Sequence, residues 1–172
     1  PSDTPDVRLV IKARPDGNEL LALIAKAEKP DPRITIRMED MCMAELYGSV
    51  DCFAIPSRFE GWGMPMREAA MLGLPVITQQ YSGMDDGHTD KWAMVINGGT
   101  LEPIPSAFAH IKGEWMRVDE GKLAGKMRWC YEYPWEAADF GLQAATWLGE
   151  NQTWDHSAKR LIDLIEEVGE WR

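Results

Sequence analysis

Short apolar runs alternate with helical patterns along the first part of the chain, and this alternation constrains the fold more than any other feature. Residues 7–13 (VRLVIKA) are apolar and rich in β-branched side chains, which is typical of a strand buried on both faces of a parallel sheet. Similar patterns predict strands at 33–37, 51–55 and 75–78 and helices at 19–29, 44–49 and 65–72. This order predicts an α/β fold built on a doubly wound parallel sheet with right-handed crossovers.

The second half of the chain follows a different pattern. Residues 79–121 are rich in Gly and Pro and hold one clear strand candidate, at 93–96, so we expect a long structured loop over one end of the sheet. Thr153 is expected to cap the last helix, whose apolar face would include Leu161 and Ile165. The helices predicted in this part lie at 122–133, 134–149 and 154–168.

Composition and charge narrow the classes of function. The length of 172 residues fits one domain with a sizeable core. A formal net charge of -10 disfavours binding to nucleic acid or anionic lipid through a general basic surface. No apolar run approaches the ~18 residues of a membrane span. The odd number of cysteines (Cys42, Cys52 and Cys130) and their spacing favour reduced structural thiols in a cytoplasmic setting.

Residues 51–83 (DCFAIPSRFEGWGMPMREAAMLGLPVITQQYSG) carry the chemistry. The predicted strand ends at Ile55, a tight loop follows, and Pro65 is expected to begin a helix. Ligands of open α/β sheets bind outside the carboxyl ends of the strands. Gly61 and Gly63 would let the backbone approach a ligand, and the helix behind them presents free N–H groups and the positive end of its dipole. The segment is therefore suited to binding a phosphate.

Two carboxylates complete this motif. Glu60 lies in the loop, and Glu68 follows about one turn into the helix, with seven residues between them. A carboxylate repels a phosphate, but it accepts hydrogen bonds from the vicinal hydroxyls of a ribose or a sugar. Amide donors flanked by carboxylates therefore suit a nucleotide-sugar, although this pattern alone does not separate that ligand from a dinucleotide.

The motif resembles the signature of the group 1 retaining glycosyltransferases (glycosyltransferase family 4). The similarity covers Pro56-Ser57-Arg58, the Glu60 and Glu68 spacing, both glycines and Gly73-Leu74-Pro75-Val76. Weaker similarity extends to residues 5–10, 81–83, 127–129 and 154–164. The resemblance implies the GT-B architecture, with this chain as the Rossmann-like donor-binding half and extra C-terminal helices.

The resemblance also implies roles for individual residues. Glu60 would be the catalytic residue beside the donor sugar, and Glu68 would hold the ribose hydroxyls of the nucleotide. The loop amides would contact the sugar hydroxyls and the leaving phosphate; they belong to Gly61, Trp62, Gly63 and Met64. The implied reaction transfers a hexose-type sugar from a nucleoside-diphosphate sugar with retention, and it needs no metal and no cofactor beyond this donor substrate.

The chain departs from the family pattern at its beginning. The chain has no match to the first strand and helix of the family's donor half, which carry an Arg and a Lys, or to the acceptor-binding half, and it starts at Pro1 without a Met. We therefore expect residues 1–172 to be one donor-binding domain of a longer enzyme, with little turnover by itself. Its partners would be the missing half and a carbohydrate or lipid-linked acceptor, and peripheral membrane contact would depend on the missing half.

Several residues keep two interpretations. Arg58 and Arg67 would contact phosphate or form ion pairs with nearby acids, and Trp62 would shape the sugar pocket or brace the loop. Residues 85–88 (DDGH) have the composition of a metal cluster, but adjacent acids before Gly favour a turn. The methionines are expected to fill irregular gaps in the core. The C-terminal tryptophans are expected to serve packing or contact with the missing half.

Two other classes of function compete with a glycosyltransferase. A non-catalytic fragment or pseudo-enzyme, acting as an interaction module or as half of a complex, would explain the missing basic pair. A nicotinamide-dependent dehydrogenase would need Gly-x-Gly-x-x-Gly after the first strand, where this chain has Arg14-Pro15-Asp16-Gly17. The dehydrogenase is therefore poorly supported.

Overall fold

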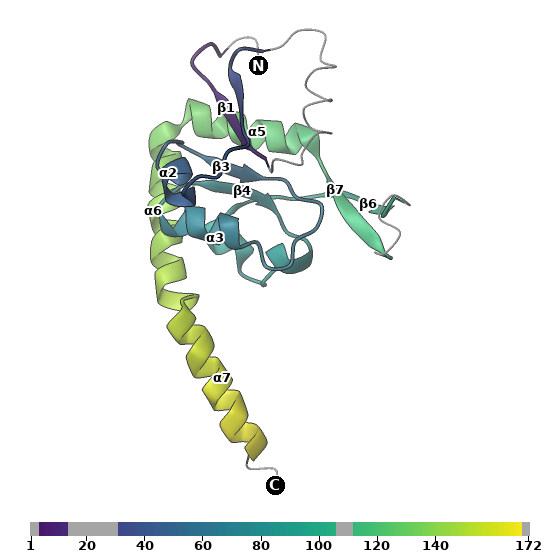
Figure 1. The fold of residues 1–172 in the computed structure, drawn as a ribbon, viewed down its shortest axis with the longest axis vertical. Coiled ribbons are helices and arrows are strands. Elements are labelled where there is room, and N and C mark those ends of the chain that lie inside the picture. Colours follow the sequence, from purple (N-terminus) through teal and green to yellow (C-terminus); the bar gives the residue numbers. More distant parts are fainter. Residues whose placement is uncertain (1–3, 14–30, 106–111, 170–172) are drawn as a thin grey trace. The chain divides into compact units, whose positions relative to one another are not determined.

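The computed structural model describes residues 4–13, 31–105 and 112–169 (Figure 1). The chain divides into two compact units, residues 1–46 and residues 47–172. The predicted helix at 19–29 lies outside the described residues.

The described residues of the first unit form two parallel strands. Strand β1 (Leu9–Lys12) pairs with β2 (Ile34–Arg37), and the register runs from Leu9 opposite Ile34 to Lys12 opposite Arg37. The strands predicted at 7–13 and 33–37 are confirmed, but the expected burial of the first strand on both faces is wrong, since Leu9 is exposed and the other residues of β1 are half-buried. Helix α2 (Met43–Tyr47) follows, close to the helix predicted at 44–49, and continues into the second unit.

The second unit is built on a parallel three-stranded sheet in the order β3-β4-β5. Its strands are β3 (Phe53–Ile55), β4 (Val76–Gln79) and β5 (Met94–Ile96), and they confirm the strands predicted at 51–55, 75–78 and 93–96. Strand β4 lies in the middle of the sheet and is buried along its whole length. The α/β class with parallel strands is therefore confirmed, and it is consistent with a Rossmann-like domain.

Helices cover this sheet. Helix α3 (Met64–Met71) packs on β3 and β4, and α5 (Glu120–Glu132) packs on β4 and β5. Figure 1 shows α5 above the sheet and α3 below it. Helix α6 (Pro134–Asn151) contacts α3, α5 and the short α4 (Thr89–Trp92). Trp92, Met66 and Leu148 are fully buried in this core, so some methionines serve packing as predicted.

The expectation of one long loop over residues 79–121 is wrong in part. Strands β6 (Gly99–Pro103) and β7 (Glu114–Val118) form an antiparallel ribbon, and the short helix η1 (Ser82–Met84) precedes α4. The first strand of the ribbon begins with Gly99 and ends with Pro103, and both residues count against a strand in sequence patterns. Pairing with β7 overrides that weak local preference. Trp115 Nε1 also donates to Glu102 Oε1 across the ribbon at 2.9 Å, which adds to the pairing.

The three C-terminal helices are confirmed with small shifts of their ends. Asp119 caps α5 by accepting from the Lys122 amide at 3.0 Å, and Thr153 Oγ1 accepts from the His156 amide at 3.4 Å at the start of α7 (Trp154–Gly169). The apolar side chains of α7, including Leu161 and Ile165, are exposed. Figure 1 shows α7 extending away from the sheet. Within the described ranges, no helix is both long enough and apolar enough to span a bilayer.

Candidate functional site

The loop between β3 and α3 is shaped by one glycine in a left-handed conformation. Gly63 precedes α3 with φ 68° and ψ 46°, and Pro65 lies in the first turn. A Cβ at this position would lie 2.3 Å from Met66 Cε, and any residue other than glycine would be strained at this φ. Among the described residues no side chain caps α3, so the first amides of the helix are available to an external acceptor.

Backbone contact with η1 braces the same loop from the side. The Glu60 carbonyl accepts from the Gly83 amide at 3.0 Å and from Ser82 Oγ at 2.7 Å. A Cβ on Gly83 would lie 1.9 Å from the Gly61 carbonyl oxygen, so only glycine fits this close approach of two backbones. Ser82 itself has a positive φ of 58°. The weak similarity noted at residues 81–83 thus falls on the segment that supports the loop.

The Glu60 side chain is held by a short relay. Ser57 Oγ donates to Glu60 Oε1 at 2.7 Å. The Ser57 carbonyl in turn accepts from the Gln79 side-chain amide, which also donates to the Met116 carbonyl at 3.1 Å. Gln79 is buried at the end of β4, so the sheet fixes where the loop leaves β3. The relay orients the Glu60 carboxylate, which is half-buried.

Glu68 is exposed on α3 and is oriented by a buried phenol. Tyr47 Oη donates to Glu68 Oε2 at 3.0 Å, and the Tyr47 ring packs edge-on against Phe53 with centroids 5.5 Å apart. Burial, together with the Glu68 carboxylate, raises the pKa of Tyr47 well above its usual range. The phenol therefore keeps its proton and remains a donor to Glu68. Sequence patterns gave no signal for this role of Tyr47.

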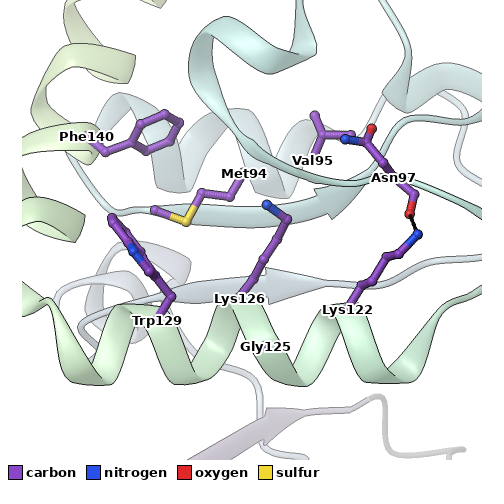
Figure 2. Close-up of a pocket in the computed structure, with 8 residues that line it drawn as sticks. All are labelled: Met94, Val95, Asn97, Lys122, Gly125, Lys126, Trp129 and Phe140. Atoms are coloured by element: carbon purple, nitrogen blue, oxygen red, sulfur yellow. Dashed lines mark hydrogen bonds between the residues drawn. The ribbon is translucent and has the colours of Figure 1, made fainter.

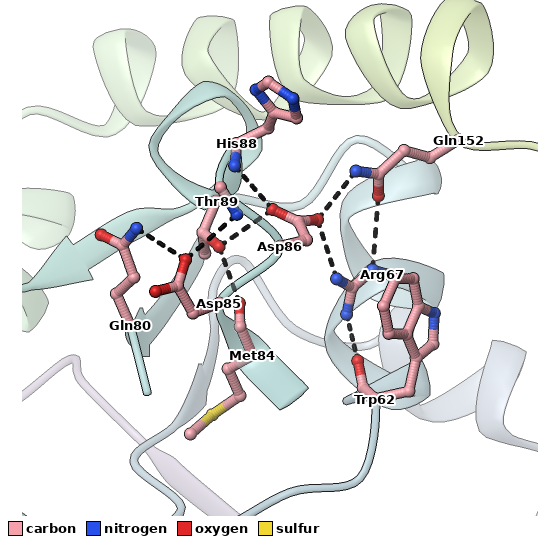
Figure 3. Close-up of polar contacts among 10 residues, drawn as sticks. Trp62, Arg67, Gln80, Met84, Asp85, Asp86, His88, Thr89 and Gln152 are labelled. Atoms are coloured by element: carbon pink, nitrogen blue, oxygen red, sulfur yellow. Dashed lines mark hydrogen bonds and ion pairs between the residues drawn. The ribbon is translucent and has the colours of Figure 1, made fainter. Parts of the chain in front are cut away.

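Arg67 forms an ion pair with an acid, which is one of the two interpretations that its sequence context left open. Its side chain is almost fully buried, and Nη2 lies 2.8 Å from Asp86 Oδ2. The guanidinium also donates to the Trp62 carbonyl and lies 4.1 Å from the centre of the Trp62 ring (Figure 3). Trp62 is 51% exposed. Its ring therefore braces the loop, and the same position leaves it open to a ligand.

Asp86 is the centre of this buried network. It accepts from Arg67, from Gln152 Nε2 at 2.7 Å and from the His88 amide at 2.8 Å (Figure 3). Burial alone would raise the pKa of Asp86, but the hydrogen bonds from Gln152, His88 and Arg67 hold it below its usual value. Residues 85–88 thus form the predicted turn, since Gly87 also donates its amide to Asp85. Sequence patterns missed the structural roles of Asp86 and Gln152.

Arg58 follows Arg67 in pairing with an acid. Its guanidinium forms an ion pair with Glu102 on the ribbon and lies 4.9 Å from the centre of the Trp115 ring. The Arg58 carbonyl also accepts from the Met116 amide at 3.2 Å. Both arginines of the motif are therefore neutralised by acids, so any anion at this loop would meet mainly backbone amides.

A separate cavity lies on the other side of the sheet. It has a volume of about 620 Å³ and opens between β5, α5 and α6 (Figure 2). None of the six predicted site residues lines it. Its walls are formed by Met94, Val95, Asn97, Lys122, Gly125, Lys126, Trp129 and Phe140.

The comparisons with known proteins agree with the motif. The family model described as "Glycosyl transferases group 1" matches residues 2–110, which is more than half of the chain. The match includes the whole loop between β3 and α3, together with α3 and η1. The chain is 26% identical over 133 residues to the lipopolysaccharide core biosynthesis mannosyltransferase LpsB of Rhizobium meliloti (strain 1021), covering 72% of this chain and 38% of that protein.

A second relative comes from a virus. The chain is 36% identical over 56 residues to the uncharacterized glycosyltransferase 335 of Sulfolobus islandicus rod-shaped virus 1, covering 33% of this chain and 17% of that protein. The chain thus aligns with less than half of the length of either relative. The match of the family model across the motif identifies the chain as a member of the group 1 glycosyltransferases.

Proposed function

We propose that this chain is the donor-binding domain of a retaining glycosyltransferase that uses a nucleoside-diphosphate sugar. The observation that carries the proposal is the start of α3, which no described side chain caps, with Glu60 in the loop before it and Glu68 one turn into the helix. Gly63 and Gly83 fix the loop between them, because any other residue at these two positions would be strained or would collide with a neighbour. Family membership supports sugar transfer in general.

In this proposal the diphosphate lies against the start of α3. The amides of the loop and the first helical turn, including those of Gly61, Trp62, Gly63 and Met64, donate to the phosphate oxygens and the sugar hydroxyls. The helix dipole favours the negative charge at that end. Because Arg58 and Arg67 are paired with acids, the backbone supplies most of the positive potential within the described residues.

The two carboxylates take different tasks. Glu68, held by Tyr47, accepts hydrogen bonds from the ribose hydroxyls and so fixes the nucleotide. Glu60, held by Ser57, faces the sugar beside the reacting carbon. Neither carboxylate serves the phosphate, since like charges repel.

The proposed transfer needs no metal and no further cofactor. The acceptor hydroxyl attacks the anomeric carbon on the face from which the nucleoside diphosphate leaves. The bond from carbon to phosphate oxygen breaks, and a phosphate oxygen takes the proton of the hydroxyl. The contribution of this domain is orientation of the donor and stabilisation of charge on the departing diphosphate.

The acceptor side of the reaction is also a proposal. An acceptor-binding half, beyond these 172 residues or on another chain, would provide the site for a carbohydrate or a lipid-linked acceptor. We place the enzyme in the cytoplasm, with membrane association only through that half. The net charge of -10 argues against a nucleic acid partner.

One observation favours a second candidate function. Both arginines of the motif are in ion pairs, which weakens the attraction of this loop for a diphosphate. A pseudo-enzyme that acts as an interaction module or as one half of a complex would need no such attraction. Donor binding separates the two functions.

The test is a titration of the purified chain with UDP, GDP, ADP and their common sugar derivatives, followed by ligand-detected NMR. We expect one nucleotide to bind saturably and to bind several-fold more weakly to Glu68→Ala. Glu150→Ala is the matched control, because Glu150 is exposed on α6 and lies outside the motif. Absence of binding at millimolar nucleotide would overturn the donor-site proposal and favour the interaction module.

A further inference from the structure

Two thiols from distant parts of the sequence meet beside the sheet. Cys52, immediately before β3, and Cys130, on α5, have their Sγ atoms 3.8 Å apart. Both side chains are half-buried, whereas Cys42 is exposed. A disulfide has a sulfur–sulfur bond of about 2.05 Å, so a movement of about 2 Å would allow these atoms to bond.

The two thiols have different environments. The hydrogen bond from Cys52 and the nearby Lys126 ammonium lower the pKa of Cys130, although burial opposes them. The same hydrogen bond and burial raise the pKa of Cys52. The Lys126 ammonium, one turn before Cys130 on α5, favours the thiolate of Cys130, so Cys130 is the better placed of the two thiols to attack a disulfide.

The cavity between β5 and α5 lies beside this pair, although neither Cys52 nor Cys130 lines it. Met94, which lines the cavity, has its Sδ 3.7 Å from Cys130 Sγ. Lys126 extends from α5 toward β5 along the cavity, one turn before Cys130 (Figure 2). Its ammonium has no ion pair among the described residues, whereas Lys122 donates to the Asn97 carbonyl at 2.8 Å.

The cavity suits one chemical class of reagent. Its volume of about 620 Å³ lies in the range of small-ligand sites. Its walls are largely apolar, with Trp129 and Phe140 among them, and Lys126 supplies positive charge, since Lys122 is paired with Asp119. A small anion therefore fits this cavity better than a cation.

We propose that Cys130 is a site of reversible thiol modification by small carboxylate-bearing disulfides of the glutathione class, and that Cys52 converts the modified thiol into a Cys52–Cys130 disulfide. This inference is independent of the proposed donor site. It adds a redox-sensitive bond between α5 and the start of β3, the strand that leads into the donor loop.

The reaction balances in two exchanges. The Cys130 thiolate attacks one sulfur of glutathione disulfide, the sulfur–sulfur bond breaks, and one glutathione leaves as a thiolate that takes up a proton. Cys52 then loses its proton and attacks Cys130 Sγ, which expels the second glutathione. Two protein thiols are oxidised to one disulfide, and one glutathione disulfide is reduced to two thiols.

The test starts from the fully reduced chain at neutral pH with excess glutathione disulfide. Intact mass and peptide mapping should show a loss of two hydrogens and a link between the peptides that hold Cys52 and Cys130, reversed by dithiothreitol. Cys52→Ser should stop at one glutathione on Cys130, and Cys130→Ser should lose the reaction at Cys52. Cys42→Ser is the control and should form the Cys52–Cys130 disulfide as the unmodified chain does.

The role of the cavity is tested by rate. Lys126→Gln should slow the first exchange by roughly fivefold, whereas Lys91→Gln, which removes an exposed lysine on α4, should leave it unchanged. Circular dichroism would verify that each variant is folded, and the peptide map of the unmodified chain requires no variant at all. Retention of both free thiols in that chain, or modification of Cys42 alone, would overturn the proposal.

Discussion

Helices α3 and α7 show opposite relations between apolar pattern and burial. Helix α3 has eight residues and only a modest apolar stripe, yet Met66, Ala69 and Ala70 are fully buried, as is most of Arg67. Helix α7 has sixteen residues and a regular apolar stripe, yet Leu161 and its apolar neighbours are exposed. A strong pattern therefore identifies a helix, but polar contacts and close backbone approaches decide how firmly the helix is held.

The buried ion pair of α3 gives the largest expected effect. Asp86→Ala would leave the buried Arg67 charge without its carboxylate, so we expect the free energy of unfolding to fall by about 3–5 kcal/mol. Denaturant unfolding measures this loss. The neighbouring Asp85→Ala is the matched control: it removes exposed contacts to Gln80 and Gly87 and should cost less than about 1 kcal/mol. Equal losses would show that the network does not hold α3.

The same pair predicts a pH dependence. Since the folded state lowers the pKa of Asp86, the carboxylate contributes stability above its unfolded pKa of about 3.9, and this contribution is lost as the pH falls through the folded pKa. The free energy of unfolding should therefore decrease as the pH falls below about 4. The decrease should be smaller in Asp86→Asn than in the unmodified chain, and identical acid profiles would contradict this assignment.

Close backbone contact gives the second largest effect. Gly83→Ala would place a Cβ 1.9 Å from the Gly61 carbonyl oxygen, so one backbone segment must move. We expect a loss of about 2–3 kcal/mol of unfolding free energy, together with weaker nucleotide binding. Gly61→Ala lies in the same loop with open space around its added methyl, and it should change stability by less than about 0.5 kcal/mol. A stability of Gly83→Ala equal to that of Gly61→Ala would show that the loop is loosely held.

A single hydroxyl tests the orientation of Glu68. Tyr47→Phe keeps the buried ring but removes the donor to Glu68, so we expect a loss of about 1 kcal/mol in stability and several-fold weaker nucleotide binding. Tyr81→Phe removes an exposed hydroxyl that donates to the Glu114 carbonyl, and nucleotide binding should stay unchanged. A Tyr47→Phe variant that binds as well as the unmodified chain would remove the phenol from the proposed site.

Sequence patterns predicted elements that depend on local rules. The strands and the C-terminal helices follow apolar periodicity, capping residues and Pro134, and all lie close to their predicted bounds. The β6–β7 ribbon escaped because its stability comes from pairing across the chain, and Gly99 and Pro103 mask it locally. The partners of Arg67 escaped for a similar reason: Asp86 and Gln152 are distant in sequence, and only the packing of α6 against α3 and α4 brings Gln152 to the pair.

The motif of the candidate site was predictable for the same local reasons. Gly63, Pro65 and the two glutamates follow one another along the chain, so their spacing alone indicates a loop before a helix. Their supports, Tyr47 and Gly83, come from other elements and show no periodicity. The roles of Glu60 and Glu68 toward a donor remain predictions that the nucleotide titration tests.

The smallest expected effect concerns α7 and sharpens the comparison most directly. Leu161→Gln with Ile165→Gln makes the apolar stripe polar without changing helix propensity much, and both side chains already face solvent in the described part of the chain. We therefore expect the free energy of unfolding to change by less than about 0.5 kcal/mol. Leu148→Ala in α6 is the contrasting control, since burial of that side chain predicts a loss of about 2–5 kcal/mol. If the α7 variant lost as much stability as Leu148→Ala, the apolar stripe of α7 would be covered in solution. Both α3 and α7 would then be buried, and they would differ only in what they contact.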